Sequence, residues 1–482
     1  MSGFEQRARR RLHRLALPPD ACLVLGFSGG PDSLALAALM RRISGRAGVR
    51  VVAVHVDHQL RAGSNQEQQR AGGLAAALGV PFRAERVAAS PLARHPGVGV
   101  EEAARRERYR VLASVARDEG AAAVCLAHHQ QDQAETVLLH LLRGAGLAGA
   151  AGMAEWSTLP LPWWPDAGSD QPEPLTLWRP LLGETKDVVR RYAEATGLDP
   201  VDDPSNVDEG FLRNAIRLQA IPLLDGLRPG AIPALARFAE LAAEDDAVLA
   251  MIATDGLARM RDVEGCLDAP ALMGEEKAVR RRIVQRWLIE AGGGSAPSME
   301  RVDAVLGLVA HGIGDRYLEV GEGRAVTLIH GRVTVGNLAV LAEQAAHDFG
   351  GPLFSARAVE EGVIPVPGHR RIGDYEVRVA RQGDQPEEGS GAFHHAAVAV
   401  VPGEEVELRP PRPGDRWARS GRRLGDWLTA QKVSTLIRGR LLCVATGGAV
   451  HLVVGMALPR FEEVDEGAAH MVRIAVTRTE GA

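Results

Sequence analysis

Short apolar runs alternate with longer stretches of helical periodicity between residues 21 and 146. This alternation predicts βα units on a parallel sheet, and so an α/β fold for the first part of the chain. Because βα connections are right-handed, the loops that follow the strands gather on one edge of the sheet, where α/β proteins bind ligands. The expected strands are 21–27, 51–55, 81–87 and 122–127, and the expected helices are 33–43, 65–78, 101–119 and 132–143.

The segment 155–178 interrupts this pattern with closely spaced prolines around the pair Trp163 and Trp164, so we expect a surface loop there. A helix is expected over 183–197, and another begins near Glu209 after a turn at 202–206. Further along, the pattern favours helices over 231–312, strands over 316–337, a linker over 350–368, and short strands with one helix at 424–430 over 372–476.

Four parts follow from this pattern. We expect a parallel-sheet domain over 1–226, a mainly helical domain over 227–345, a linker over 346–370 and a small α+β domain over 371–482. The length of 482 residues agrees, since roughly 150 residues per domain gives two to four domains.

Composition narrows the class of protein. No stretch reaches the roughly 20 consecutive apolar residues of a membrane-spanning helix, and the basic N-terminus leads into no apolar run of a signal peptide. We therefore expect a soluble, cytoplasmic protein without a membrane partner. The four cysteines lie far apart in the chain, which favours small core residues over a metal or redox pair.

The formal net charge of −5 hides a basic segment at 409–440, which holds nine Lys or Arg against two Asp. Trp417 and Trp427 lie among these cations. The combination suits phosphate contacts and base stacking on structured RNA, although a solvated charged face would explain the arginines alone.

The loop 28–33 reads Ser-Gly-Gly-Pro-Asp-Ser and stands between an expected strand and an expected helix. Its glycines let backbone N–H groups approach an anion at a helix N-terminus. No G-x-x-x-x-G-K-[ST] motif occurs, so the lysine of a Walker loop is missing. Asp32 would repel phosphate unless Mg²⁺ lies between them. The alternative is a glycine-rich turn with Asp32 as the N-cap of the helix.

This loop resembles the SGGxDS motif of the PP-loop ATP pyrophosphatases, which cleave ATP to AMP and pyrophosphate. Five further motifs resemble, in order and spacing, those of the tRNA(Ile)-lysidine synthetases in that superfamily: HVDH at 55–58, EEAARRERY at 101–109, AHHQQDQAET at 127–136, RPLL at 179–182 and DDPSN at 202–206 followed by FLRNAIR at 211–217. The likeness covers most of 20–220, and RPGDR at 412–416 is similar to that family's closing tRNA-binding domain.

The resemblance implies a Rossmann-like ATP pyrophosphatase domain, a mainly helical middle domain that binds tRNA over 227–345 and a small α+β C-terminal domain that binds tRNA over 371–482. It also implies a reaction in which the wobble cytidine of a CAU-anticodon tRNA(Ile) is adenylated by ATP, and free L-lysine then displaces AMP. Two positions depart from the family pattern: Gln131 stands where Asp is usual, and Ser434 where proline is common.

Candidate site residues follow from these motifs. We expect Asp32 to hold Mg²⁺ and Asp32, Arg105, His128 and Asp132 to serve catalysis; the full set for ATP is Ser28, Gly29, Gly30, Pro31, Asp32, Ser33, His55, Arg105 and Arg108. The expected lysine site is Asp132, Glu135 and Arg213, and the expected tRNA contacts are Arg412, Arg416, Arg422 and Arg423.

Plainer interpretations remain open at this point. Asp132 and Glu135 could be the N-cap and first-turn acid of a helix, His128 a core histidine, and Arg105 and Arg108 exposed helix residues. Two other functions also compete: a tRNA thiolation enzyme, which should show paired cysteines, and a non-catalytic relative that binds RNA or nucleotide. The sequence leaves the oligomeric state open, a homodimer included.

Overall fold

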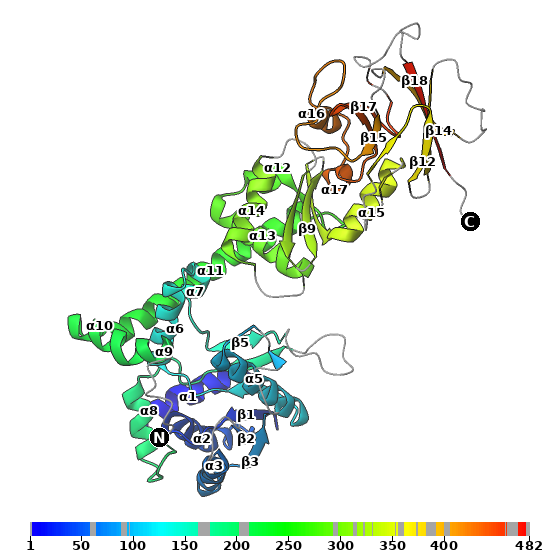
Figure 1. Cartoon of the computed structure of the whole chain (residues 1–482). Coiled ribbons are helices and arrows are strands. Elements are labelled where there is room, and N and C mark those ends of the chain that lie inside the picture. The colour runs from blue at the N-terminus through cyan, green and yellow to red at the C-terminus, as the bar shows by residue number, and fades with distance from the viewer. Residues whose placement is uncertain are drawn as a thin grey trace. The chain divides into compact units, whose positions relative to one another are not determined.

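The computed structural model describes residues 2–57, 64–87, 94–95, 97–161, 174–201, 212–292, 297–311, 316–321, 323–329, 331–351, 353–354, 361–372, 375–381, 392–399, 405–457, 459 and 471–478 (Figure 1). The chain forms two compact units, Met1–Leu249 and Ala250–Ala482. Helix α11 (Ala231–Met260) contains the boundary between them.

The first unit contains a six-stranded sheet in the order β3-β2-β1-β4-β6-β5. All neighbours are parallel except β5, which runs antiparallel to β6. Strand β1 therefore lies between β2 and β4, which is the switch point where open α/β sheets bind ligands. The strands are β1 (Cys22–Gly26), β2 (Arg50–Asp57), β3 (Phe82–Arg86), β4 (Ala121–Cys125), β5 (Trp156–Leu159) and β6 (Leu175–Trp178).

Helices cover both faces of this sheet, because alternate strand residues point to opposite sides. On β1, Leu23 and Leu25 join a core with α1, α2, α3 and α8, whereas Cys22 and Val24 join a second core with α5. These helices are α1 (Gly3–Arg14), α2 (Pro31–Ser44), α3 (Ser64–Leu78), α5 (Val100–Asp118) and α8 (Lys186–Glu194). The parallel-sheet fold predicted for this part of the chain is confirmed.

The remaining helices of the first unit follow α6, the helix after β4. They are α6 (Gln130–Leu142), α7 (Leu147–Ala150), α9 (Leu212–Ala215), a π-helical turn η2 (Ile216–Ala220) and α10 (Ile221–Leu227). Ala134 of α6 packs against Ile216 and Ile221, so η2 is held against α6. The expected turn at 202–206 lies outside the described residues.

The prediction of a loop throughout 155–178 is wrong at both ends, where the structure has β5 and β6. The pairing of β6 with β4 explains the difference: a four-residue strand on a preformed sheet needs no long apolar run of its own. Residues 162–173 lie outside the described part of the chain.

The second unit begins with helices packed on a small antiparallel sheet, as the pattern over 231–337 predicted. Val279, Ile283, Trp287 and Leu288 of α13 are all buried in its core. The elements are β7 (Leu267–Asp268), α12 (Ala269–Gly274), α13 (Lys277–Gly292), α14 (Met299–Ala310), β8 (Arg316–Gly321), β9 (Arg324–Ile329) and β10 (Arg332–Asn337).

The last part of the chain has two four-stranded sheets that share one core. Within the stretch expected to be a linker, the structure has the end of α15, the strand β11 paired with β15, and the start of β12. The elements are α15 (Leu338–Phe349), β11 (Gly362–Ile364), β12 (Gly368–Ile372), β13 (Tyr375–Arg381), β14 (Ala392–Ala399), β15 (Val406–Arg409), α16 (Leu424–Ala430), α17 (Thr435–Arg438), β16 (Cys443–Thr446), β17 (Ala449–Val453) and β18 (Met471–Arg478).

The structure also bears on the expectations about the cysteines and about membrane-spanning helices. All four cysteines are buried, as expected of core residues. Among the described helices, none is long and apolar enough to cross a membrane.

Candidate active site

The loop 28–33 is a tight turn whose own hydroxyl groups organise its backbone. Ser33 Oγ accepts a hydrogen bond from the Gly29 N–H at 3.1 Å and donates one to the Gly30 carbonyl at 2.9 Å. The Gly30 N–H donates to Ser28 Oγ at 3.3 Å. These hydrogen bonds fix the turn that leads from β1 into α2. The glycines of the loop therefore lie at the switch point of the sheet.

Gly29 is the position where this turn requires glycine. Its φ of +86° lies in the left-handed region, and a Cβ there would come within 2.9 Å of Val201 Cγ2. The Val201 N–H also donates to the Gly29 carbonyl at 3.0 Å. Backbone from the far end of the domain therefore closes over the loop.

Asp32 lies in the first turn of α2, and the N-cap of that helix is Gly30. The alternative that Asp32 is the N-cap is therefore wrong. Its side chain keeps 36% of its surface exposed, whereas its Oδ1 is buried and has no hydrogen-bond partner among the described residues. Burial raises the pKa of Asp32, but His129, Lys186 and Arg190 outweigh it and lower the pKa overall. The carboxylate is charged at neutral pH and has one oxygen available to a ligand.

His129 joins Asp32 to a second carboxylate. Its Nε2 lies 3.7 Å from Asp32 Oδ2 and its Nδ1 lies 3.2 Å from Asp132 Oδ2. His129 is also the N-cap of α6, and its backbone N–H donates to Asp132 Oδ2 at 2.9 Å. Asp132 is thus the third residue of α6 and not its N-cap, which corrects the plainer interpretation. The motif singled out His128 for catalysis, whereas the structure gives His129 the bridging place.

Glu135 is completely buried, and its carboxylate is surrounded by donors. Arg217 Nε donates to Oε1 at 2.7 Å and Arg217 Nη2 to Oε2 at 2.9 Å, while Arg213 Nε donates to Oε2 at 3.1 Å. Gln131 Nε2 adds a donor at 3.2 Å to Oε1. Burial raises the pKa of Glu135, but Arg217 and Arg213 outweigh it and hold the pKa below its ordinary value.

Arg213 and Arg217 also extend toward Asp132, with Nη2 to Oδ1 distances of 3.5 and 3.6 Å. Sequence reasoning assigned Arg213 to this place and missed Arg217, which stands in the same motif four residues later. The signal was present, because residues four apart share one helix face. The structure therefore brings together all three residues expected for the lysine site, with Arg217 and Gln131 added.

His128 lies among cations. Burial lowers the pKa of His128 well below its ordinary value, and Arg179, Arg213, Arg108 and Arg105 lower it further. Its Nδ1 is buried without a hydrogen-bond partner among the described residues. A neutral imidazole surrounded by guanidinium groups indicates a site for an anion, since the bound anion would offset their repulsion.

Arg105 and Arg108 stand on α5 close to the ring of a buried tyrosine. Their guanidinium carbons lie 5.0 and 5.8 Å from the centre of the Tyr109 ring, which packs in the core beneath α5. Tyr109 thus holds both arginines by cation–π contact. The interpretation of these arginines as merely exposed helix residues does not account for this support.

His55 supports the loop from the neighbouring strand. It is buried near the end of β2, and its Nδ1 lies 3.1 Å from the Phe27 carbonyl. Burial lowers the pKa of His55, so the ring is neutral and Nδ1 donates to that carbonyl. The Phe27 N–H in turn donates to the Val54 carbonyl at 2.8 Å. These two hydrogen bonds fix the backbone of Phe27, the residue that precedes the phosphate loop.

In the second unit, the expected RNA contacts lie on an ordered turn. The completely buried Arg409 makes two hydrogen bonds to Asp415, at 2.7 and 3.0 Å, which hold the turn 410–415. Arg412 pairs with Glu361 at 2.7 Å, and Arg416 Nη1 donates to the Gly421 carbonyl at 2.6 Å. All four expected residues, Arg412, Arg416, Arg422 and Arg423, are exposed.

The proposal of base stacking on both tryptophans is wrong for Trp417. That ring is buried and packs edge-on against Trp427, with ring centres 4.9 Å apart. Trp417 is therefore a core residue of the small domain, and Trp427, half-buried, remains the ring with an accessible face.

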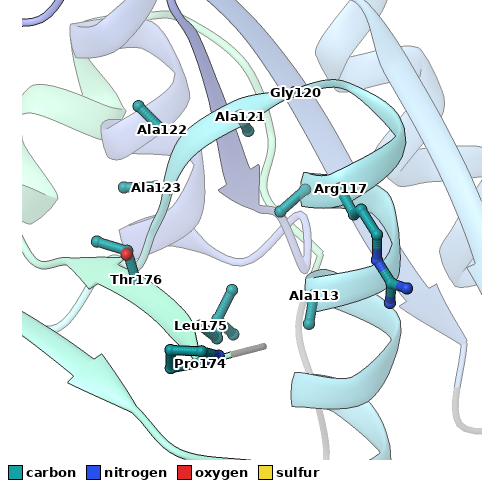
Figure 2. A pocket seen from close by; sticks show the side chains of 10 residues that line it. Ala113, Arg117, Gly120, Ala121, Ala122, Ala123, Pro174, Leu175 and Thr176 are labelled. Carbon is teal, nitrogen blue, oxygen red and sulfur yellow. The ribbon is translucent and has the colours of Figure 1, made fainter. Parts of the chain in front are cut away.

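A cavity of about 300 Å³ lies at the other end of the sheet. Figure 2 shows that its labelled side chains come from the end of α5 and from the starts of β4 and β6. Half of its lining residues are alanines, and it stands at the amino ends of the strands, away from the edge where α/β proteins bind ligands. We assign no role to it.

The glycine loop at the switch point of a parallel sheet, followed by a row of carboxylates and arginines on the same edge, defines a PP-loop nucleotide-binding protein. The family model described as "PP-loop domain" accordingly matches residues 4–224. The chain is 31% identical over 491 residues to the tRNA(Ile)-lysidine synthase of Symbiobacterium thermophilum, covering 96% of this chain and 95% of that protein. The chain belongs to the tRNA(Ile)-lysidine synthase family.

Two shorter relatives support the assignment. The tRNA(Ile)-lysidine synthase of Salinispora arenicola is 40% identical over 339 residues, covering 70% of this chain and 96% of that protein. That of Salinispora tropica is 38% identical over 323 residues, covering 66% and 92%. The alternative of a thiolation enzyme is therefore not favoured.

Proposed function

We propose that this enzyme ligates L-lysine to C2 of the wobble cytidine of a CAU-anticodon tRNA(Ile), using ATP and releasing pyrophosphate and AMP. Membership of the tRNA(Ile)-lysidine synthase family supports the reaction. The structural observation that supports this reaction is the arrangement of Asp32, His129 and Asp132. The His129 imidazole lies within 3.7 Å of both carboxylates. This arrangement joins an ATP half to a lysine half.

The ATP half is the loop 28–33 with Asp32. Mg²⁺ binds through one or two carboxylates and shares phosphate oxygens with its substrate. Asp32 fits this donor set, because it is charged and its buried Oδ1 lacks a hydrogen-bond partner among the described residues. Bound there, the ion would neutralise charge on the leaving pyrophosphate. Because the N–H groups of Gly29 and Gly30 and the Ser33 hydroxyl already donate hydrogen bonds within the loop, the Ser28 hydroxyl and the positive N-terminal end of α2 would orient the phosphates.

Arg105 and Arg108 act on the α-phosphate in this proposal. The cytidine C2 oxygen attacks the α-phosphorus, the bond from that phosphorus to the bridging oxygen breaks, and pyrophosphate leaves with the bonding pair. Negative charge on the α-phosphate oxygens is offset by the two guanidinium groups that Tyr109 holds in place. The neutral ring of His128 lies among the same arginines and would contact the nucleotide without adding to the positive charge.

The lysine half is Asp132 with the buried group Glu135, Arg213 and Arg217. The substrate arrives with a protonated ε-amine, since its ordinary pKa is about 10.4, and Asp132 is suited to receive that ammonium. The deprotonated amine attacks C2 and the bond from C2 to the AMP oxygen breaks. Arg213 and Arg217 reach past Glu135 toward Asp132 and are suited to the carboxylate of the lysine.

The basic turn at 410–423 in the second unit is proposed to contact tRNA phosphates through Arg412, Arg416, Arg422 and Arg423. We retain 1–226 as the catalytic domain, 227–345 as a tRNA-binding middle domain and 371–482 as the C-terminal tRNA-binding domain. Cytoplasmic location fits a tRNA substrate.

Purified protein, ATP, labelled lysine and tRNA(Ile) transcripts carrying CAU test the proposal directly. Label should enter tRNA(Ile), AMP should form in equal amount, and a CAU initiator tRNA(Met) should stay unlabelled. Asp32→Ala should reduce AMP formation by at least about 1000-fold, because the charge that holds the metal and the leaving group is removed. Equal labelling of the two tRNAs, or AMP formation by Asp32→Ala at the normal rate, would disprove the proposed reaction.

A further inference from the structure

Lys186 is a charged residue at the active site that the motifs did not single out. It is the first residue of α8 and is half-buried. Within the part of the chain that the structure describes, its ammonium makes no hydrogen bond and no ion pair. Burying an ammonium without a partner costs free energy, so its position requires an explanation beyond stability.

The position of Lys186 is fixed at both ends of its helix. Before α8, the Glu184 carbonyl accepts the N–H of Gln130, the first residue of α6, at 2.9 Å. After α8, the chain returns to the phosphate loop, where the Val201 N–H donates to the Gly29 carbonyl at 3.0 Å. Between them, Val189 and Ala193 pack into the core with α2. The start of α8 is thus held beside the start of α6, and the helix packs on α2, which begins at the phosphate loop.

The charges around Lys186 belong to the catalytic site. Burial lowers the pKa of Lys186, and Arg190 and Arg217 lower it further, whereas Asp32 and Glu135 act in the opposite direction. Lys186 in turn is one of the cations that lower the pKa of Asp32. The ammonium therefore lies within electrostatic reach of two carboxylates and two guanidinium groups of the site, and the positive charges outnumber the negative ones. A bound anion with more than one negative charge would neutralise the excess positive charge around Lys186.

We propose that Lys186 is a phosphate-binding residue of the ATP site, pairing with the β- and γ-phosphate oxygens and with the pyrophosphate that leaves. This rests on the proposed ATP reaction and deepens it. The chain lacks a Walker lysine, and Lys186 supplies that charge from a different element, the start of α8. The amino groups of the substrate lysine are excluded as partners of Lys186, because ammonium ions side by side repel each other; the lysine carboxylate is the competing anion, and KM for lysine tests it.

The variants Lys186→Met and Lys186→Arg, with Arg191→Met as control, test this in the full-length protein. Arg191 is exposed on the same helix, and its Nε donates to the Asp187 carbonyl. Calorimetric titration with pyrophosphate and Mg²⁺ measures binding without catalysis. Lys186→Met should weaken pyrophosphate binding about 10- to 100-fold, the loss of one charge-assisted hydrogen bond, while Lys186→Arg retains most of it and Arg191→Met all of it.

ATP–pyrophosphate exchange with tRNA(Ile) and no lysine provides the second measurement. Lys186→Met should slow exchange and leave KM for lysine within about twofold of the wild type in the complete reaction. A raised KM for lysine with normal pyrophosphate binding would overturn the proposal, as would equal effects of Arg191→Met. Absence of exchange in the wild-type protein would instead count against the proposed function, because the pyrophosphate titration still reports on Lys186.

Thermal unfolding separates this role from a structural one. Because the ammonium has no partner among the described residues, Lys186→Met should unfold at the same temperature as the wild type or higher. A lower unfolding temperature together with unchanged pyrophosphate affinity would make Lys186 a structural residue and reject the proposal. Lys186→Gln, which keeps a polar end without charge, serves if the Met variant does not fold.

Discussion

The carboxylate of Glu135 is too deeply buried to contact the substrate directly. Its surface is fully covered, and both oxygens already accept bonds from Arg213 and Arg217. Glu135 therefore acts on substrate through those arginines, whose remaining N–H groups extend toward Asp132. Gln131 completes the arrangement as a neutral donor, where the family's usual Asp would add a second negative charge beside Glu135.

The burial of Glu135 leads us to predict how the stability of the protein depends on pH. Glu135→Gln should lower the free energy of unfolding by about 2–3 kcal/mol at pH 7, less than a fully buried pair loses, because the arginine side chains are 24% and 25% exposed. The folded pKa of Glu135 lies below the ordinary 4.5, so its contribution is complete above that value and is lost as the pH falls through the folded pKa.

Urea unfolding at pH 7, 5 and 3.5 measures this difference in stability between wild type and variant. The difference should be largest at pH 7 and 5 and should shrink at pH 3.5. Glu102→Gln, which removes an exposed partner of Arg106 on α5, should leave stability nearly unchanged at each pH. A difference that is constant or grows in acid would contradict the assignment.

At the same scale, the sequence located most of the site. Asp132, Glu135 and Arg213 lie together as expected, because their motifs fall at the carboxyl edge of one sheet. Arg217 could have been found from its spacing of four residues from Arg213. Lys186 was missed for a physical reason: the packing of α8 on α2 sets where it lies, and that packing does not follow from spacing along the chain.

Between elements, the phosphate loop depends on a contact that is remote in sequence. Gly29→Ala must place a Cβ 2.9 Å from Val201 Cγ2 at a φ of +86°, so stability should fall by about 1–2 kcal/mol from the backbone alone. The loop would shift away from Val201, and KM for ATP should rise at least tenfold.

Gly30→Ala is the matched control for the loss of stability that is predicted for Gly29→Ala. Its φ is −69°, and the nearest atoms to an added Cβ lie at 3.4 and 3.7 Å, which is ordinary contact. Its free energy of unfolding should stay within about 0.5 kcal/mol of the wild type, as for substitutions without a named strain. Equal destabilisation by the two alanines in urea titrations would reject a special role for the Gly29 turn.

The elements themselves were predictable to different degrees. Strands β1, β2 and β4 are recognisable as apolar runs, since both faces of the central part of a parallel sheet are covered by helices, whereas β3 is an edge strand of mixed composition. The short strands β5 and β6 are not, because their pairing with β4 and with each other, rather than their own composition, makes them strands. The expected linker similarly contains β11, which is three residues long and depends on β15 for its hydrogen bonds.

For the whole molecule, the net charge of −5 conceals a basic turn in the second unit. In that turn, the ion pair of Arg409 and Asp415 is internal, so it shapes the turn and contributes nothing to phosphate attraction at its surface. Exposed arginines provide that attraction, and Arg422 and Arg423 precede α16 on this turn. Their contribution should depend strongly on salt, because bound RNA releases counterions.

The double variant Arg422→Gln/Arg423→Gln tests this contribution. The slope of log affinity for tRNA(Ile) against log salt should become shallower by about 1.5, at roughly 0.7–0.9 for each phosphate that the variant no longer neutralises. KM for lysine should not change, because these residues lie outside the catalytic domain. The control removes the same charge from exposed, ion-paired positions outside the proposed tRNA-binding domains by Arg42→Gln/Arg50→Gln and should keep the wild-type slope. An unchanged slope in the first variant would show that tRNA binds elsewhere on the molecule.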